Sequence, residues 1–325
     1  MELRQKLILG YSCLIVFLFK QKKPIFVSWS ITEQCNLQCK YCHVWRKSEP
    51  LELPTHLVLG IINTLSKMGT KMMRLTGGEP LARDDITQII NHAHALGIYT
   101  VLSTNGILFS EKIKEINKLD RVSISLEGPE SIHDSIRGGG SYKKAVEAIE
   151  IAKRKNIPVS IATTLNALNL DSMDYLLRLG ERFNAKVVFQ PAIQTCLYSQ
   201  EENPLSPDIT QYRKAILKLV RLKNTNKFIG NSMAGLRHLY HWPVRTDINC
   251  VAGKIICRLD CKGRMKPCGR FDIKNNTLDV VEKGVEKCFD QLDHPSCGYC
   301  WCSSFVELNL FSKFNLSVLI NLIKA

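Results

Sequence analysis

A regular alternation of β-rich and helical runs extends from residue 24 to residue 191 and leaves few folds open. Predicted strands occupy residues 25–31, 71–76, 98–103, 121–126, 159–163 and 186–190. Predicted helices occupy residues 51–68, 84–96, a short stretch from Ser110, 142–155, 170–183 and 210–223. Repeated strand-then-helix units indicate a parallel sheet with right-handed crossovers. Six units are too few to close an eight-stranded barrel, so we predict an α/β fold, an open partial (βα)6 TIM-like barrel with a small C-terminal cysteine-rich domain.

The rest of the sequence adds three parts to this core. We expect an apolar N-terminal helix over residues 1–23, a core domain over 24–225, a cysteine-rich domain over 245–304 and an apolar tail over 305–325. Prolines within residues 203–207 mark the connection that follows the last predicted strand.

The apolar run of residues 7–19 lies between Lys6 and Lys20 and is similar to the apolar part of a signal peptide. No small-residue cleavage site follows it, and it is too short to span a bilayer, which takes about 20 residues. Two interpretations stay open: a helix packed on the body of the protein, which we favour, or an interfacial helix whose basic flanks contact anionic lipid. The C-terminal tail has the same two alternatives, packing within the protein or contact with a membrane or partner surface.

Three cysteines follow the first predicted strand within one short segment: Cys35, Cys39 and Cys42, at the spacing C-x3-C-x2-C. Three thiolates can each bind one iron of a [4Fe–4S] cluster, which leaves the fourth iron without a protein ligand. An open metal position distinguishes a catalytic site from a closed structural one. The spacing alone also allows a zinc knuckle or three buried thiols, alternatives that the later motifs make less favourable.

The cysteine segment, with Tyr41 just before its third cysteine, resembles the motif of the radical S-adenosylmethionine (SAM) superfamily. In that superfamily the open iron binds the amino and carboxylate groups of SAM. A second matching segment, Thr76-Gly77-Gly78-Glu79-Pro80, follows the second predicted strand. Paired glycines let a backbone approach a ligand closely, and a glutamate can bond an ammonium group. The resemblance implies that this Gly-Gly-Glu-Pro segment contacts the amino group of SAM.

Polar residues at other predicted strand ends complete the expected cofactor site, since active sites of such barrels lie at the C-terminal ends of their strands. Asn105 and Ser125 suit ribose and carboxylate recognition. Arg137 is expected either to pair with the SAM carboxylate in a fork or to be a solvated loop residue. Glu127 stands where aspartate is commoner in the superfamily, and we expect His133 to be structural. The predicted cofactor-binding residues are Tyr41, Gly77, Gly78, Glu79, Pro80, Asn105, Ser125 and Arg137.

A second group of cysteines lies between residues 250 and 302. Cys250, Gly263 and Cys268 match C-x(9–15)-G-x4-C, which opens the SPASM and twitch domains of the superfamily. Cys297 and Cys300 add a C-x2-C pair. This resemblance implies that Cys250, Cys268, Cys297 and Cys300 bind a second, auxiliary [4Fe–4S] cluster, with tetrahedral zinc as the alternative.

Only one cysteine follows that pair, which favours the shorter twitch form with a single auxiliary cluster. Three cysteines remain as substitute ligands: Cys257, Cys261 and Cys302. Buried, inert thiols explain three others best: Cys13, Cys196 and Cys288. In the sulfatase-maturing branch an aspartate that acts as a base follows the second auxiliary cysteine. In this chain Gly269 stands at that position, and Asp272 is merely near.

The resemblance implies an enzyme that cleaves SAM reductively to a 5′-deoxyadenosyl radical, which abstracts hydrogen from a peptide, carbohydrate or other small molecule. The auxiliary cluster would accept an electron or anchor the substrate, and a flavodoxin- or ferredoxin-type protein would donate electrons. Rival interpretations are a non-catalytic Fe–S electron carrier and a radical SAM enzyme acting on a lipid-linked substrate at the membrane surface. The 13 cysteines cluster at metal-ligand spacings, which indicates a reducing, cytoplasmic setting. The net charge of +14 favours anionic partners, but no RNA-recognition motif occurs, so nucleic acid is not expected.

Overall fold

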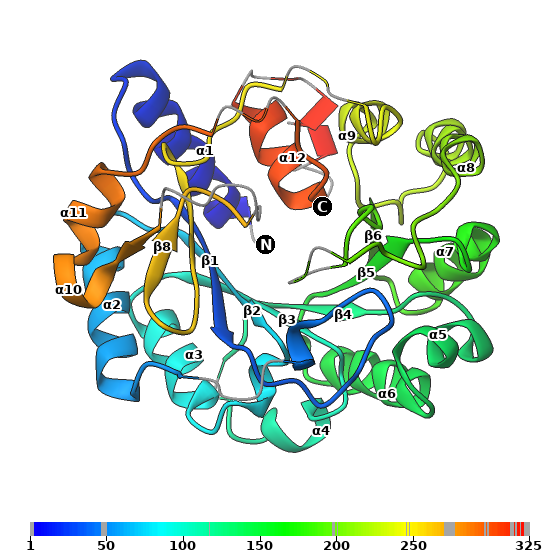
Figure 1. The fold of residues 1–325 in the computed structure, drawn as a ribbon, viewed down its shortest axis with the longest axis horizontal. Coiled ribbons are helices and arrows are strands. Elements are labelled where there is room, and N and C mark those ends of the chain that lie inside the picture. Colours follow the sequence, from blue (N-terminus) through cyan, green and yellow to red (C-terminus); the bar gives the residue numbers. More distant parts are fainter. Residues whose placement is uncertain are drawn as a thin grey trace.

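The computed structural model describes residues 3–46, 51–116, 118–196, 199, 201–244, 246, 248–269, 277–295, 297, 299–312, 315, 317–318 and 320–321. Among these residues, one nine-stranded sheet has the order β6-β5-β4-β3-β2-β1-β7-β8-β9. The strands are β1 (Phe26–Thr32), β2 (Met72–Gly77), β3 (Tyr99–Thr104), β4 (Arg121–Ser125), β5 (Val159–Leu165), β6 (Lys186–Pro191), β7 (Ile256–Leu259), β8 (Arg264–Lys266) and β9 (Leu278–Asp279). Strands β1 to β6 run parallel, and β6 and β9 form separate edges, so the predicted open barrel is confirmed (Figure 1).

Helices surround the outside of the curved sheet (Figure 1). They are α1 (Leu3–Leu18), α2 (Thr55–Lys67), α3 (Ile86–Ala95), α4 (Phe109–Lys112), α5 (Glu130–Arg137), α6 (Ser141–Arg154), α7 (Met173–Arg182), α8 (Ile209–Leu222), α9 (Met233–Leu239), α10 (Val280–Lys283), α11 (Val285–Asp290) and α12 (Ser303–Phe311). The predicted core helices are present, with ends shifted by a few residues. Helix α5 is an addition, because the sequence pattern gives this polar stretch as a loop.

The cysteine-rich segment continues the barrel sheet. Strand β7 pairs in parallel with β1, where Ile256 lies opposite Phe26. Strands β8 and β9 then add antiparallel pairs beyond β7. The sheet therefore carries this segment on the side of the barrel where the cysteine loop begins.

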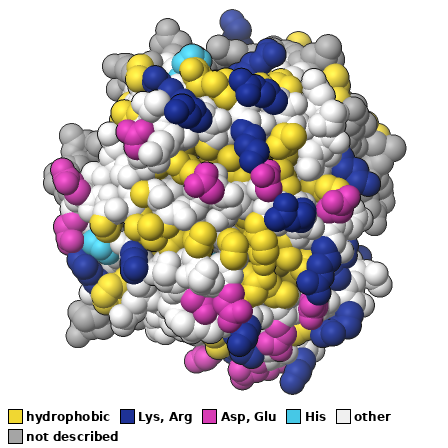
Figure 2. Space-filling view, turned by 90° about the vertical axis from the view of Figure 1, so that its right-hand side faces the viewer, with side chains coloured by type: hydrophobic (Ala, Val, Ile, Leu, Met, Phe, Trp, Pro, Cys, Tyr) yellow, Lys and Arg dark blue, Asp and Glu magenta, His cyan; other side chains and the backbone are white. Residues whose placement is uncertain are grey.

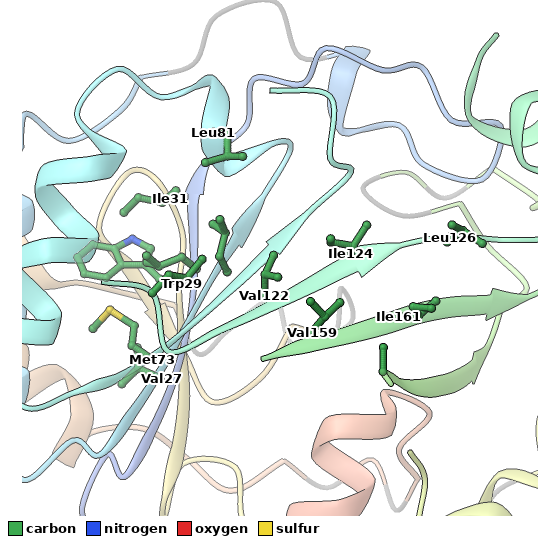
Figure 3. Close-up of a cluster of buried hydrophobic side chains, with 14 of the residues drawn as sticks. Val27, Trp29, Ile31, Met73, Leu81, Val122, Ile124, Leu126, Val159 and Ile161 are labelled. Atoms are coloured by element: carbon green, nitrogen blue, oxygen red, sulfur yellow. The ribbon is translucent and has the colours of Figure 1, made fainter. Parts of the chain in front are cut away.

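The two faces of the barrel sheet differ in polarity. Alternate residues of a strand point to opposite faces. Val27, Trp29 and Ile31 of β1 point to the helix side, where they form one buried core with side chains of the other strands (Figure 3). Buried parallel strands usually carry apolar residues on both faces. Here Ser28 and Ser30 alternate with the apolar residues, so the inner face of the barrel is polar.

Helix α1 packs on the protein body, which is the arrangement that we favoured from the sequence. Its residues Leu9, Cys13 and Val16 are buried in a cluster with Ile25 and Phe26. The opposite side of the helix leaves apolar side chains exposed, namely those of Leu7, Ile8, Tyr11 and Leu18. No helix in the described part of the chain is long and apolar enough to cross a membrane.

The C-terminal tail also packs inward where it is described. Phe311 and Val318 belong to the same buried cluster as α1. Residues 313, 314, 316, 319 and 322–325 of the predicted tail lie outside the described residues. On the face that lies to the right in Figure 1, basic and acidic side chains are interspersed among apolar ones, so the net charge is not gathered there into one basic patch (Figure 2).

Candidate functional site

The paired glycines after β2 lie against the backbone that leads into the cysteine loop. Gly78 N donates to Thr32 O at 2.9 Å, and Glu79 N donates to Gln34 O at 2.7 Å. A Cβ atom on Gly77 would lie 2.2 Å from Thr32 O, and one on Gly78 would lie 2.1 Å from Gln34 O. Gly77 also has a φ of 142°. Only glycine permits this approach, so the Gly-Gly-Glu backbone fixes the base of the cysteine loop.

The three thiols of the loop are free and lie near one another. Burial raises the pKa of Cys35 and of Cys42 to about 11, and the charge of Cys39 acts in the same direction on both. Metal binding removes such thiol protons. Among the described residues, no three Cys, His, Asp or Glu side chains converge on a single ion position. The thiolates of a cluster bind different irons and therefore lie farther apart, so three neighbouring thiols on one loop fit the chemistry of a [4Fe–4S] site.

A buried ion pair between Arg137 and Glu127 lies against the cysteine loop, next to Cys39 and Tyr41. Arg137 Nε and Nη2 donate to Glu127 Oε1 at 3.0 and 2.7 Å. The Tyr41 hydroxyl donates to the same oxygen at 2.8 Å, and Thr164 N donates to Glu127 Oε2 at 3.0 Å. The remaining edge of the guanidinium faces the loop, with Nη1 3.9 Å from Cys39 Sγ. The network connects the ends of β4 and β5 to the cysteine loop.

This network decides between the two alternatives for Arg137. Its side chain is 11% exposed and lies at the end of α5, so the solvated-loop interpretation is wrong. Glu127 accepts from two of its donor nitrogens, Nε and Nη2, and Nη2 also donates to the Tyr41 hydroxyl, whereas Nη1 is directed toward Cys39. Glu127 itself is fully buried, and its carboxylate accepts from four residues, which makes it a positioning residue; the donors are Tyr41, Arg137, Thr164 and Asn169.

Glu79 joins the end of β2 to the end of β3. Thr104 Oγ1 donates to Glu79 Oε1 at 2.7 Å, Leu81 N donates to the same oxygen at 3.2 Å, and Asn105 N donates to Oε2 at 2.7 Å. Burial raises the pKa of Glu79 to about 7, although the bonds from Asn105 and Thr104 oppose that shift. A carboxylate has about four acceptor sites, so Oε2 retains capacity for an ammonium group.

The other predicted cofactor residues also lie at this edge of the sheet. Asn105 Nδ2 donates to Asn36 Oδ1 at 2.7 Å, which fixes the amide on the cysteine loop. Ser125 is half-buried at the end of β4, and Pro80 is buried at the start of a single 3-10 turn, Pro80–Ala82. His133 is buried, and its Nδ1 accepts from Glu127 N at 3.1 Å. Burial lowers the pKa of His133 to about 3, so its ring is neutral.

The fold and this loop geometry match a known family. The profile described as "Radical SAM superfamily" matches residues 29–180, which contain the cysteine loop and the Gly-Gly-Glu-Pro segment. Residues 29–180 of this chain belong to the radical SAM superfamily. Among curated relatives, an AdoMet-dependent heme synthase of Oleidesulfovibrio alaskensis is 34% identical over 49% of this chain and 43% of its own length. The mycofactocin maturase MftC of Mycolicibacterium smegmatis is 28% identical over 75% of this chain and 64% of its own length.

Solved structures share the fold of this chain at low sequence identity. SuiB of Streptococcus suis bound to S-adenosylmethionine matches with a TM-score of 0.69 and 14% identity, over 88% of this chain and 69% of that chain. Native anSMEcpe with bound AdoMet matches with a TM-score of 0.65 and 18% identity, over 82% of this chain and 80% of that chain. The chain thus spans 43% to 64% of the length of the two curated relatives named above.

Five of the later cysteines come together next to the barrel. Burial raises the pKa of Cys300 well above its ordinary value, and the charges of Cys302, Cys250 and Cys268 act in the same direction. Burial likewise raises the pKa of Cys250, and the charge of Cys297 adds to it. The four predicted auxiliary ligands are thus neighbours in space, with Cys302 beside them.

The other two substitute ligands lie elsewhere. Cys257 is buried in the main core, on β7. The pKa of Cys261 is raised by burial and then by the nearby charges of Glu33, Asp260 and Glu52, and no other thiol is among the main causes of that shift. The three thiols predicted to be inert are buried: Cys13, Cys196 and Cys288. Asp272, considered above as a base, lies outside the described residues.

Proposed function

We propose that this protein binds a [4Fe–4S] cluster through Cys35, Cys39 and Cys42 and cleaves SAM reductively. When bound, the cluster supplies the electron that converts SAM to methionine and a 5′-deoxyadenosyl radical able to abstract hydrogen from a substrate. The observation that carries this proposal is the bonding of the Gly-Gly-Glu backbone to the base of the cysteine loop. It favours catalysis over the rival Fe–S carrier, because an electron carrier needs neither a Gly-Gly-Glu-Pro segment nor an open iron.

The protein's own residues would bind and orient SAM beside the loop. Glu79 Oε2, which accepts one described bond, is available to the SAM amino group. The Nη1 edge of Arg137 offers positive charge near Cys39 for the carboxylate. Glu127 holds that guanidinium in place from a position without water access, since it is 0% exposed. Asn105 and Ser125 would serve the ribose from the ends of β3 and β4.

We also propose an auxiliary [4Fe–4S] cluster held by Cys250, Cys268, Cys297 and Cys300. Its support is the resemblance to the twitch domain, together with the proximity of the thiols: the charges of Cys250 and Cys268 help to raise the pKa of Cys300, and that of Cys297 helps to raise the pKa of Cys250. Cys302 is the substitute ligand nearest to this group. The cluster would accept an electron from the substrate radical or anchor the substrate, and zinc is the alternative metal, to be decided by metal analysis.

For the substrate we propose a chemical class and no individual compound. The curated relatives are a maturase and heme synthases, and one solved relative of the fold is SuiB bound to the precursor peptide SuiA. We therefore propose a peptide or another organic small molecule, with a flavodoxin- or ferredoxin-type electron donor. A lipid-linked substrate is a second candidate, supported only by the exposed apolar side chains of Leu7, Tyr11 and Leu18 on α1.

The test is product formation from SAM. Anaerobically reconstituted protein, reduced with dithionite and given SAM, should form 5′-deoxyadenosine slowly even without substrate. The triple variant Cys35→Ala, Cys39→Ala and Cys42→Ala should form none, whereas Cys13→Ala, a buried cysteine of α1, should match the wild type. Wild-type protein that makes no 5′-deoxyadenosine would favour the electron-carrier alternative.

A further inference from the structure

Three arginines lie at one level of the inner face of the barrel. Strand register places Ser28 of β1 opposite Arg74 of β2 and opposite Arg258 of β7. Arg74 lies opposite Val101 of β3, which lies opposite Arg121 of β4. Because register partners in a parallel sheet point to the same face, these side chains all project to the interior.

The level above, toward the cofactor site, carries hydroxyl groups. Ser30 lies opposite Thr76, and Ser103 lies opposite Ser123, which lies opposite Ser160. The Ser103 hydroxyl is buried and has no hydrogen-bond partner among the described residues. A buried hydroxyl without a partner is unfavourable unless a ligand or water completes its bonding.

The level below the arginines is apolar and closes the barrel. Phe26 lies opposite Met72 and Ile256, and Met72 lies opposite Tyr99. Helix α1 packs its buried side against Phe26 and Ile256. The arginine level is therefore the floor of a polar interior whose upper edge holds the cysteine loop.

The charges of Arg74 and Arg121 on this floor are not balanced by the described protein groups. Arg74 has no hydrogen bond or ion pair with any described residue, and Arg121 has only a 3.4 Å bond from Nε to the Tyr99 hydroxyl. Burial lowers the pKa of Arg74, and the nearby charge of Arg121 lowers it further, whereas that of Cys302 raises it. Arg258 donates to Ser30 Oγ at 2.7 Å and packs against Gly269, where a Cβ atom would lie 2.0 Å from Nη1. Half-buried guanidinium groups without an anion are costly, so this floor is suited to receive one.

We propose that Arg74 and Arg121 bind an oxyanion of the substrate, a carboxylate or a phosphate, inside the barrel between the SAM site and the auxiliary cysteines. The inference rests on the proposed function and adds the substrate class to it. Each guanidinium presents its donors in a planar fork that matches either oxyanion. Gly77 lies three residue steps beyond Arg74, roughly 10 Å along a strand, so the substrate must reach about that far from its anionic group toward SAM.

The direct test is anion binding, with citrate and pyrophosphate as probes in calorimetric titrations of cluster-loaded protein. The wild type should bind at least one probe, and Arg74→Gln and Arg121→Gln should each weaken that binding roughly ten- to hundredfold, the range for hydrogen bonds to a charged group. Arg154→Gln, an exposed change on α6, should bind as the wild type does. Binding of citrate alone indicates a carboxylate substrate, and binding of pyrophosphate alone indicates a phosphate. Absence of binding to the wild type, or equal binding by all variants, would overturn the proposal.

Two further measurements separate this role from others. Without added anion, Arg74→Gln should unfold at the same or a higher temperature, because it removes an uncompensated charge; a lower midpoint would assign Arg74 a structural role and overturn the proposal. SAM should bind Arg74→Gln with unchanged affinity, and a loss equal to that of the anion would assign the arginines to SAM instead. Wild type that forms 5′-deoxyadenosine but binds neither probe refutes only this inference, whereas wild type that forms none refutes the proposed function.

Discussion

The contact between the glycine pair and the cysteine loop predicts a large effect of adding one methyl group. In Gly78→Ala the new Cβ atom would lie 2.1 Å from Gln34 O, far inside van der Waals contact with a backbone atom. The two segments must separate, which breaks the bonds Gly78 N to Thr32 O and Glu79 N to Gln34 O. Each bond contributes about 0.5–1.5 kcal/mol, so the loss is about 1–3 kcal/mol of unfolding free energy.

The separation also displaces the start of the cysteine loop. We therefore expect Gly78→Ala to bind less iron per chain after reconstitution and to bind SAM more weakly. The assays are urea unfolding of the metal-free protein, iron analysis and SAM titration.

The matched control is Gly60→Ala in α2. That glycine is exposed, and a Cβ atom there would meet nothing within 4 Å. Alanine favours a helix interior over glycine by roughly 0.5–1 kcal/mol, so this variant should be slightly more stable and should load iron normally. Gly78→Ala with wild-type stability and wild-type iron content would show that glycine is not required at this contact.

Three other outcomes follow from the site. Reconstituted wild type should contain about eight irons, and Cys35→Ala, Cys39→Ala, Cys42→Ala together should leave about four; loss of all iron, or zinc in place of the remainder, would contradict two separate clusters. Arg137→Leu leaves Glu127 buried without its ion-pair partner and should lower the free energy of unfolding in urea by about 3–5 kcal/mol. The control Lys143→Gln breaks an exposed pair with Glu130 and should lower it by about 0–1 kcal/mol. Equal losses would show that the buried pair contributes no more stability than the exposed one. Glu79 has a folded-state pKa of about 7 against an ordinary 4.5, so the stability that it contributes is complete below 4.5 and is lost as the pH rises through 7. Glu79→Gln should flatten that decline, about 3 kcal/mol in metal-free protein, and an unchanged slope between pH 5 and 8 would contradict the raised pKa.

The six core strands could be predicted because each is a short β-rich run followed by a helical one. The strands toward the β9 edge of the sheet were harder to predict. Strand β9 comprises only Leu278–Asp279, and β7 and β8 are short runs within a segment dominated by cysteines and turns. Strand β7 pairs with β1 through residues more than 200 positions apart, which local sequence patterns do not encode, and β8 and β9 extend the sheet from β7.

The residues of the candidate site also differ in how far the sequence predicts them. Cys35 and Gly78 could be predicted because each belongs to a short contiguous motif that resembles one of the radical SAM superfamily. The role of Glu127 could not be predicted, since its partners come from three separate segments of the chain. The sequence predicts the arginine floor only in part. Ser28 and Arg74 are polar residues between apolar neighbours in their strands, which places them on the inner face, but only the strand register shows that they lie at the same level.

The most direct test of the central claim is whether SAM binds to iron at the Cys35, Cys39 and Cys42 site. Pulsed electron–nuclear double resonance on reduced protein with ¹⁵N-labelled SAM measures the coupling between the amino nitrogen and the cluster. The variant Cys250→Ala with Cys268→Ala would restrict the signal to the first cluster. We expect a nitrogen coupling in this variant and in the wild type; a reduced cluster whose spectrum is unchanged by SAM, with no nitrogen coupling, would contradict SAM binding at this site.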